Sequence, residues 1–229
     1  MAGNLDDIKR AYSRRSEAGD KERYSLWEQG PLFRFQELQR AILKLLDRQG
    51  FRPLEEVRIL DVGCGNGGLL RDLVNYGANP ANLSGIDLLE DRIASARRLS
   101  PHLDLRVVNA AELPFPDDSF DLALAFTVFS SIKDAEMREA VAAEIMRVLR
   151  KGGALLWYDF WTNPVNRDVE PLGLDEVQRL FGCEPVEARR ETLAPPIARI
   201  LASRSWLACQ LLAKIPLLRT HWLALVRVQ

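Results

Sequence analysis

Apolar and polar residues follow two rhythms along this chain, one typical of buried strands and the other of amphipathic helices. Short aliphatic runs predict strands at 57–62, 83–87, 105–109, 122–128 and 154–159. Apolar stripes at helical spacing predict helices at 69–76, 93–99, 134–149 and 174–181. Strands that alternate with helices indicate an α/β fold built on a parallel sheet that is buried on both faces.

The N-terminal residues 1–50 depart from this alternation, because they carry two helical stripes and no strand pattern. We expect them to form a helical lid over a ligand cleft, with Tyr24 and Trp27 as walls. The alternative is that these helices only pack on the sheet.

A second departure is the helical insertion predicted at 193–219, between an edge strand at 185–192 and a last strand at 221–228. The insertion has a broad apolar face and four basic residues, and it contains no acid. Its interpretation is a cap over the cleft or a dimer contact, in a single domain spanning 1–229 that is a monomer or homodimer. The alternative is a cap that recognises an acceptor with an apolar tail or an anionic group, as a peripheral membrane or lipid-linked contact.

The stretch V-R-I-L-D-V-G-C-G-N-G-G-L-L at 57–70 joins a predicted strand to a predicted helix through four glycines. Glycine permits positive φ and lets a ligand approach the backbone, and the free N–H groups of a helix's first turn face such a ligand. The order of strand, glycine turn and helix is how α/β proteins hold a nucleotide. Gly63-x-Gly65-x-x-Gly68 also satisfies the dinucleotide pattern, so a hydride-transfer enzyme is an alternative at this point.

Two carboxylates accompany this turn. Asp61 lies two residues before the first glycine, where it would repel a pyrophosphate and suit an ammonium group. Asp87 ends the next predicted strand, roughly 20 residues beyond the loop, where a carboxylate accepts hydrogen bonds from a ribose diol. A helix cap is the alternative role for Asp87.

Composition and charge restrict the function further. The chain has 229 residues, 47% of them hydrophobic and 28% charged, with a net charge of −1, which gives no basic field for nucleic acid. Three scattered cysteines and two histidines predict neither a disulfide framework nor a metal site. No secretory signal or membrane-spanning run is visible, so a cytoplasmic enzyme is expected.

Three motifs together resemble those of class I S-adenosylmethionine-dependent methyltransferases that act on small molecules. D-V-G-C-G-N-G at 61–67 resembles their acid-x-Gly-x-Gly-x-Gly loop, and L-R-K-G-G at 149–153 resembles the turn into their fifth strand. N-A-A-E-L-P-F-P-D-D-S-F-D at 109–121 resembles their adenine-binding turn, with Asn109 where the family usually has Asp. A nicotinamide enzyme has no reason to carry this last block, so the resemblance favours a methyltransferase.

The resemblance implies a seven-stranded Rossmann-like sheet of order 3-2-1-4-5-7-6, with strand 7 antiparallel and helices on both faces. It implies S-adenosyl-L-methionine as methyl donor, S-adenosyl-L-homocysteine as product, and no metal. The residues assigned to the donor site are Asp61, Gly63, Cys64, Gly65, Asp87, Leu88, Asn109, Ala110, Ala111, Phe126 and Tyr24.

The predicted reaction is methyl transfer to a small molecule or biosynthetic intermediate, at an oxygen atom. The alternatives are a C- or N-methyltransferase acting on a quinone, polyketide or amine, and a non-catalytic adenosylmethionine-binding protein. Many family members carry a His pair where Ser130 and Ser131 stand here, which weakens the expectation of a histidine-based mechanism. If the acceptor has to lose a proton, Asp159, His221 and Tyr158 are the candidate bases.

Overall fold

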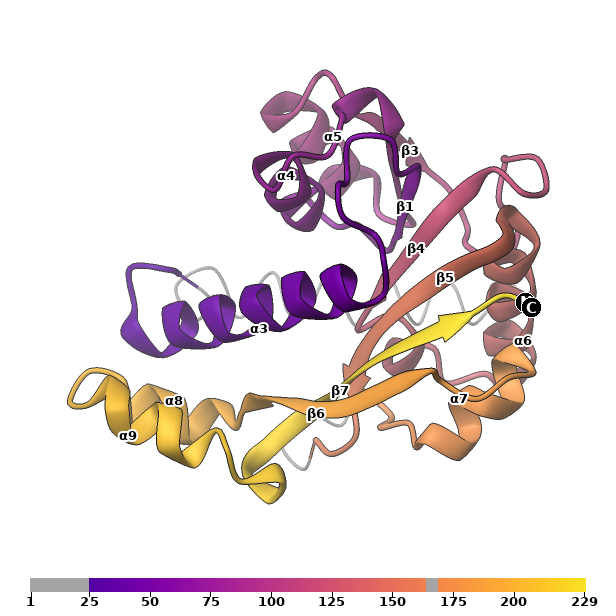
Figure 1. The fold of residues 1–229 in the computed structure, drawn as a ribbon. Coiled ribbons are helices and arrows are strands. Elements are labelled where there is room, and N and C mark those ends of the chain that lie inside the picture. Colours follow the sequence, from indigo (N-terminus) through magenta and orange to yellow (C-terminus); the bar gives the residue numbers. More distant parts are fainter. Residues whose placement is uncertain (1–24, 164–168) are drawn as a thin grey trace.

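The computed structural model describes residues 25–163 and 169–229, which form a seven-stranded sheet of order β3-β2-β1-β4-β5-β7-β6 (Figure 1). The first five strands pair in parallel, and β7 runs antiparallel to both of its neighbours, so the predicted strand order and the direction of the last strand are confirmed. The strands are β1 (Ile59–Val62), β2 (Leu83–Asp87), β3 (Asp104–Val107), β4 (Phe120–Phe126), β5 (Leu149–Phe160), β6 (Glu187–Leu193) and β7 (Arg219–Arg227).

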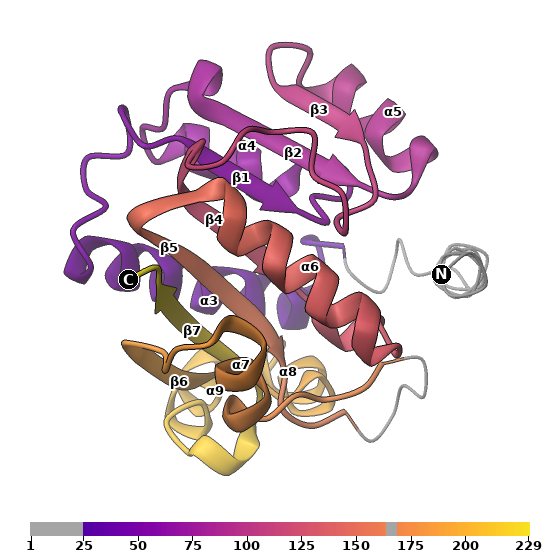
Figure 2. The ribbon, with the colours of Figure 1, turned by 90° about the vertical axis from the view of Figure 1, so that its right-hand side faces the viewer.

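Helices cover both faces of the sheet, because successive strand residues point to opposite sides. On one face Ile59 and Leu122 pack with α3, α4 and α5, and on the other Leu60 and Ala123 pack with α6 and α7. Figure 2 shows α6 crossing the near face while α3 lies behind the sheet. These helices are α3 (Gln29–Arg48), α4 (Gly68–Asn75), α5 (Glu90–Leu99), α6 (Ala135–Val148) and α7 (Leu174–Phe181).

The register of the central strands brings three side chains to one edge of the sheet. Val62 of β1 is level with Ile86 of β2 and with Ala125 of β4. The residues that follow, including Gly63, Asp87 and Phe126, therefore gather at the carboxyl edge, where ligands of open α/β sheets bind.

The chain between β6 and β7 forms α8 (Pro195–Leu201), α9 (Trp206–Leu212) and the 3₁₀ turn η3 (Pro216–Leu218), with two further 3₁₀ turns at η1 (Pro80–Asn82) and η2 (Phe129–Ser131). This hairpin packs on the N-terminal half of α3, and the ring of Phe33 meets that of Trp206 edge-on at 5.2 Å between centroids. The helices approach so closely that a Cβ on Gly30 would lie 2.8 Å from the Cα of Arg199. In Figure 1 the three helices extend together beyond the sheet.

Two predicted boundaries are wrong by several residues. β5 begins at Leu149 rather than at 154, because the segment predicted as a turn continues the strand past an irregularity in its pairing with β4. α5 begins at Glu90 rather than at 93, since Glu90 and Asp91 supply negative charge to its first turn.

Within the described ranges, no helix combines the length and the apolar character needed to cross a membrane.

Candidate functional site

The loop between β1 and α4 turns sharply through glycines in the left-handed region. Gly63, Gly65 and Gly67 have φ values of 73°, 56° and 76°. A Cβ on Gly63 would lie 2.8 Å from Cγ2 of Val128, so a side chain there meets both backbone strain and a clash. The loop is pinned to β2 by a 2.8 Å hydrogen bond from the Cys64 N–H to the Ile86 carbonyl.

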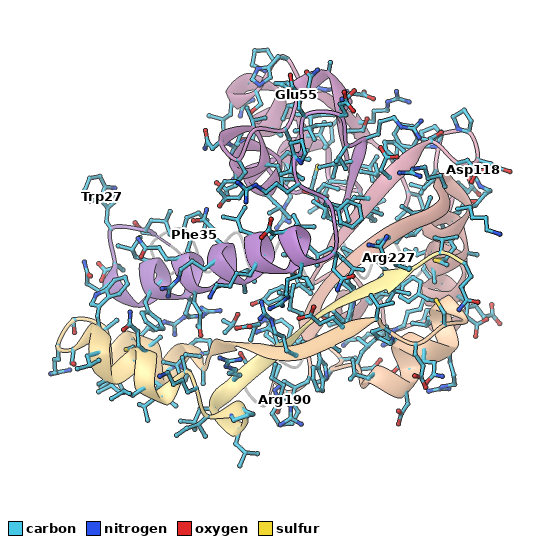
Figure 3. The ribbon with its side chains drawn as sticks, viewed as in Figure 1. Trp27, Phe35, Glu55, Asp118, Arg190 and Arg227 are labelled. Atoms are coloured by element: carbon cyan, nitrogen blue, oxygen red, sulfur yellow. The ribbon has the colours of Figure 1, made fainter. Side chains whose placement is uncertain are left out.

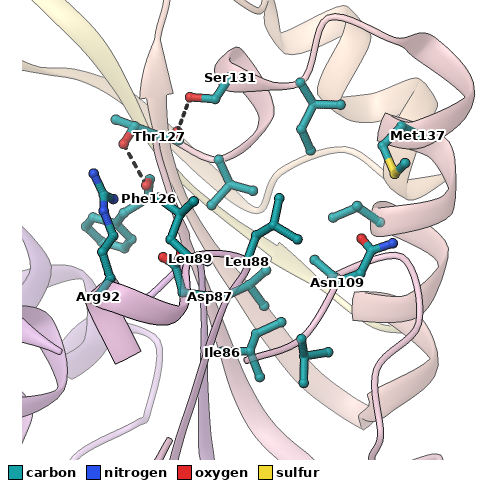
Figure 4. A pocket seen from close by; sticks show the side chains of 17 residues that line it. Ile86, Asp87, Leu88, Leu89, Arg92, Asn109, Phe126, Thr127, Ser131 and Met137 are labelled. Carbon is teal, nitrogen blue, oxygen red and sulfur yellow. Dashed lines mark hydrogen bonds between the residues drawn. The ribbon is translucent and has the colours of Figure 1, made fainter. Parts of the chain in front are cut away.

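Asp87 ties two loops together from the end of β2. Its Oδ2 accepts a 2.9 Å hydrogen bond from the Gly65 N–H, and its Oδ1 accepts one of the same length from the Leu89 N–H. Each carboxylate oxygen has a further lone pair, so the group can still accept from a ligand hydroxyl. Figure 4 shows Asp87 at the wall of a cavity, between Ile86 and Leu88.

The first cavity, which we call the Asn109 cavity, has a volume of about 220 Å³. The Asn109 side chain forms its polar corner, and Oδ1 accepts a 3.1 Å hydrogen bond from the Ala111 N–H. Figure 4 shows Asn109 and Met137 on one side and Phe126 and Thr127 on the other. The remaining walls are mostly aliphatic, and its lining is Val62, Gly63, Ile86, Asp87, Leu88, Leu89, Arg92, Val108, Asn109, Ala110, Phe126, Thr127, Val128, Ser131, Ile132, Met137 and Val141.

The second cavity, the Asp61 cavity, has a volume of about 260 Å³ and lies between the glycine loop and α3. Gly63 and Phe126 line both cavities, so the two adjoin at the carboxyl edge of the sheet. In Figure 3 the Phe35 side chain points from α3 toward the part of the molecule that carries the glycine loop and α4. The lining is Phe35, Leu38, Gln39, Ile42, Asp61, Gly63, Cys64, Gly68, Leu69, Asp72 and Phe126.

Asp61 is the unusual group of this cavity. Its side chain is 2% exposed, and its Oδ1 has no hydrogen-bond partner in the described part of the chain. Burial, with repulsion from Asp87 as the smaller cause, raises the pKa of Asp61 to about 8. A buried carboxylate without a donor is costly, and a cationic ligand would satisfy it.

Comparison with known proteins agrees with this geometry. A family model described as "Methyltransferase domain" matches residues 60–157. This range contains nearly all of β1 to β4, most of β5 and all the residues that line the Asn109 cavity. Residues 60–157 therefore match a methyltransferase domain, and the strand order is the fold shared with solved S-adenosylmethionine-dependent methyltransferases.

Two curated relatives and one solved structure illustrate the likeness. 27-O-demethylrifamycin SV methyltransferase of Amycolatopsis mediterranei is 36% identical, over 60% of this chain and 50% of its own length. Fatty-acid O-methyltransferase of Mycolicibacterium smegmatis is also 36% identical, over 56% of this chain and 47% of its own. The chain thus spans about half the length of these relatives.

The solved structure is geranyl diphosphate C-methyltransferase of Streptomyces coelicolor in complex with Mg²⁺, geranyl diphosphate and S-adenosyl-L-homocysteine. It superposes with a TM-score of 0.61 at 15% identity, covering 85% of this chain and 82% of its own. At this identity the likeness shows the shared fold.

Most of the predicted donor-site residues lie at the cavities. Gly65 and Ala111 do not line them, since both face their own loops and donate N–H groups to Asp87 and Asn109. Tyr24 lies outside the described residues. The residues brought to the two cavities are Asp61, Gly63, Cys64, Asp87, Leu88, Asn109, Ala110 and Phe126.

Trp27 was expected to wall the donor, and this expectation is wrong for the described structure. Its side chain is 95% exposed and stands away from α3 in Figure 3. Trp27 lies two positions before the first residue of α3, in an exposed turn.

The structure also gives the candidate base Asp159 a different use. Its carboxylate is fully buried and accepts backbone N–H bonds from Ser130 at 3.0 Å and from Phe160 at 2.9 Å. Burial raises the pKa of Asp159 to about 6, although the hydrogen bonds from these N–H groups lower it in part. Oδ2 thus holds the turn after β4, Oδ1 accepts from the neighbouring residue of β5, and Asp159 lines neither cavity, so its role as a base stays a prediction.

His221 and Tyr158 are likewise engaged within the protein. Their rings stack in parallel, 4.5 Å apart, and the Tyr158 hydroxyl lies 2.6 Å from Oγ1 of Thr192. Nδ1 of His221 lies 2.9 Å from Oγ1 of Thr220. Burial, aided by the charge of Arg34, lowers the pKa of His221 to about 3, so its ring is neutral and a weak base. Neither residue lines a cavity, and their role as proton acceptors stays a prediction.

Several cavity residues were missed from the sequence. Phe35 and Gln39 reach the Asp61 cavity from α3, and Met137 reaches the Asn109 cavity from α6. Their only signal was an ordinary helical stripe. Thr127 follows β4 with a backbone φ of 56°, in the left-handed region. Threonine rarely adopts this conformation, so the sequence gives no signal for it.

Proposed function

We propose that this chain catalyses S-adenosylmethionine-dependent methyl transfer to an oxygen atom of a small-molecule acceptor. The observation that carries the proposal is the buried, unpartnered Asp61 carboxylate oxygen at the glycine turn, within a cavity that adjoins a second one bordered by Asp87 and Asn109. The cationic amino-acid part of the donor matches Asp61, its ribose matches Asp87, and its planar base matches Asn109.

Each part of the donor then has a partner. Asp61 pairs with the ammonium of the methionine part, which would lower the pKa that burial has raised. Gly63 lets the donor pass between the two cavities, since it lines both and no side chain fits there. Asp87 accepts from the ribose hydroxyls while keeping its bonds to the loop amides.

The adenine lies in the Asn109 cavity. Ala110 contributes little bulk beside the base, and Met137 and Val141 cover one of its faces. The amide of Asn109 both donates and accepts, so it suits the edge of an adenine although the family usually places Asp there.

When bound, the donor supplies a methyl group already activated by the sulfonium. The protein's contribution is to hold the acceptor oxygen in line with that methyl group and to exclude water. Phe126 is placed to do this because it is the side chain common to both cavities, apart from the glycine. The names of the two curated relatives, both of which act at oxygen, support O-methylation.

The test is transfer of a radiolabelled methyl group from S-adenosylmethionine to small molecules of a cell extract, with chromatography of the product. We expect one labelled small molecule for the wild type and at least a tenfold loss for Asp61→Asn. Asp47→Asn is the matched control, because Asp47 is exposed on α3 and, within the described residues, forms an ion pair only with the exposed Arg52. Absence of label with the wild-type protein, despite donor binding, would make the chain a binding protein instead.

A further inference from the structure

The helical hairpin of α8, α9 and η3 (residues 195–218) carries apolar residues on both of its sides. One side packs on Phe33 of α3, in a small core whose fully buried members include Ala198 and Cys209. A helix that covers a protein with one face ordinarily carries polar residues on the other, and helices that are apolar all round are buried. Here the outer side has five large aliphatic side chains that are between 44% and 75% exposed: Ile200, Leu207, Leu211, Ile215 and Leu217. Packing within the described chain does not account for their number.

These exposed side chains lie close together in the fold. Leu207 and Leu211 are four positions apart in α9, so they lie one above the other on the same side of the helix. Ile215 comes directly before η3, and Leu217 lies within it. Figure 1 shows the hairpin extending beyond the sheet together with α3. Large exposed apolar patches mark sites that meet a partner or a membrane.

The charge of this region is entirely positive. Residues 192–229 include five basic residues and no acid, although the chain as a whole has a net charge of −1. Within the described residues, the one ion pair of this stretch joins Arg219 to Glu191 at 3.5 Å. The basic residues of the hairpin are exposed and form no ion pair with a described carboxylate: Arg199, Arg204 and Lys214. Uncompensated cations beside exposed aliphatic side chains fit a partner that is both anionic and apolar.

Position and charge decide between the candidate occupants of this side. The hairpin contributes no residue to the lining of either cavity, so it is not a lid over the donor site. In a two-fold dimer the same patch would meet itself, which would bring its cations together without a carboxylate between them. A membrane with anionic lipids suits both features of the patch, because aliphatic side chains enter the acyl boundary while the long stems of Lys and Arg carry their charges to the head groups.

We propose that this hairpin attaches the protein to an anionic lipid surface, with its exposed leucines among the lipids and its three basic residues at the phosphates. The proposal goes beyond methyl transfer and does not rest on it. α3 joins the attached region to the donor site, because Phe33 packs on the hairpin whereas Phe35 lines the Asp61 cavity. Attachment holds that cavity one helix away from the lipid surface.

The experiment is sedimentation of the full chain with vesicles of phosphatidylcholine alone and of an equal mixture of phosphatidylcholine and phosphatidylglycerol. We expect the wild type to bind the mixed vesicles about 100-fold more strongly, because each of three basic residues near an anionic surface contributes about fivefold. Most of this preference should disappear in the triple variant Arg199→Gln/Arg204→Gln/Lys214→Gln. Binding to the mixed vesicles should fall about tenfold or more in Leu207→Ser/Leu211→Ser, which removes two aliphatic side chains from the lipid.

Each hairpin variant has a matched control elsewhere on the surface. Arg98→Gln/Lys151→Gln/Arg179→Gln removes the same charge from exposed positions on α5, β5 and α7. Leu99→Ser/Val107→Ser removes two exposed apolar side chains, which are 58% and 45% accessible. Both controls should bind mixed vesicles within about threefold of the wild type, since neither touches the hairpin. Because all these side chains are exposed, the Tm of each variant should stay within about 2 °C of the wild type.

Three outcomes overturn the proposal: equal binding to the two kinds of vesicle, no binding to either, or equal losses in the hairpin variants and their controls. Sedimentation velocity without lipid tests the second copy as occupant. A dimer that dissociates in Leu207→Ser/Leu211→Ser, without vesicle binding by the wild type, would assign the patch to self-association and also overturn the proposal. The charge variant and the leucine variant are independent, so if one of them fails to fold the other decides.

Discussion

The buried carboxyl of Asp61 makes donor binding depend on pH in a calculable way. With a pKa of about 8, the carboxyl of the ligand-free protein is mostly protonated at pH 7. Only about one molecule in ten then carries the carboxylate that pairs with an ammonium. The donor's α-amino group, with a pKa of about 7.8, stays charged until the pH approaches 8.

The product of the two charged fractions gives the size of the effect. It rises about 20-fold between pH 6 and pH 8, equivalent to about 1.8 kcal/mol of binding free energy, and declines again above pH 8. Below pH 8, binding should therefore release a proton to the buffer. The sign for folding is opposite: the folded protein binds this proton more tightly than the unfolded chain, so Asp61 lowers stability as pH rises from about 4 to 8.

The assay is titration calorimetry with S-adenosylhomocysteine between pH 6 and pH 8, in buffers of different ionisation enthalpy. Asp61→Asn should remove the proton release and flatten the rise in affinity below pH 8. 5′-Methylthioadenosine, which lacks the amino-acid part, is the matched ligand control and should show no such rise with the wild type. An affinity that is flat from pH 6 to 8 in the wild type, or an equal slope in Asp61→Asn, would refute the reasoning.

Three further predictions concern the same edge of the sheet. Gly63→Ala should lower the unfolding free energy by about 2 kcal/mol or more and weaken donor binding. The control is Gly50→Ala, which should suffer the backbone strain alone, because Gly50 has a φ of 80° and open space around it. Equal losses of unfolding free energy in denaturant melts would count against the clash with Val128. Asp87→Ala should cost about 2–4 kcal/mol of stability, because the Gly65 and Leu89 amides lose their acceptor, and a loss below half a kcal/mol in the same melts would show that these bonds are unimportant. Asp159, whose pKa is raised to about 6, should make the wild type lose about 2 kcal/mol more stability than Asp159→Asn as pH rises from 4 to 7; parallel stability profiles for the two proteins would contradict this.

Much of the donor side was predictable because its signals are local in the sequence. The aliphatic run before Gly63 has to be a buried strand, and glycines at 63, 65 and 67 are needed wherever φ is positive. Asp61 and Asp87 follow strands whose carboxyl ends meet by the rules of parallel sheets. Strand order follows from the same rules together with the family resemblance.

The acceptor side could not be predicted, because it depends on contacts between distant segments. Leu193 donates its N–H to Glu37 across 156 positions, and nothing in either neighbourhood indicates that α3 lies against β6. Asp159 looked like a base because it ends a strand at the ligand edge. Its carboxylate instead holds the amide of Ser130, a pairing fixed by the tight turn after β4 rather than by any motif.

A crystal structure of the complex with S-adenosylhomocysteine tests the central claim most directly. We expect the adenine in the Asn109 cavity, the ribose hydroxyls on Asp87, and the ammonium within hydrogen-bond distance of Oδ1 of Asp61. A nucleoside bound elsewhere on the chain, or a complex in which the amino-acid part leaves Oδ1 of Asp61 without a partner, would contradict the proposed site.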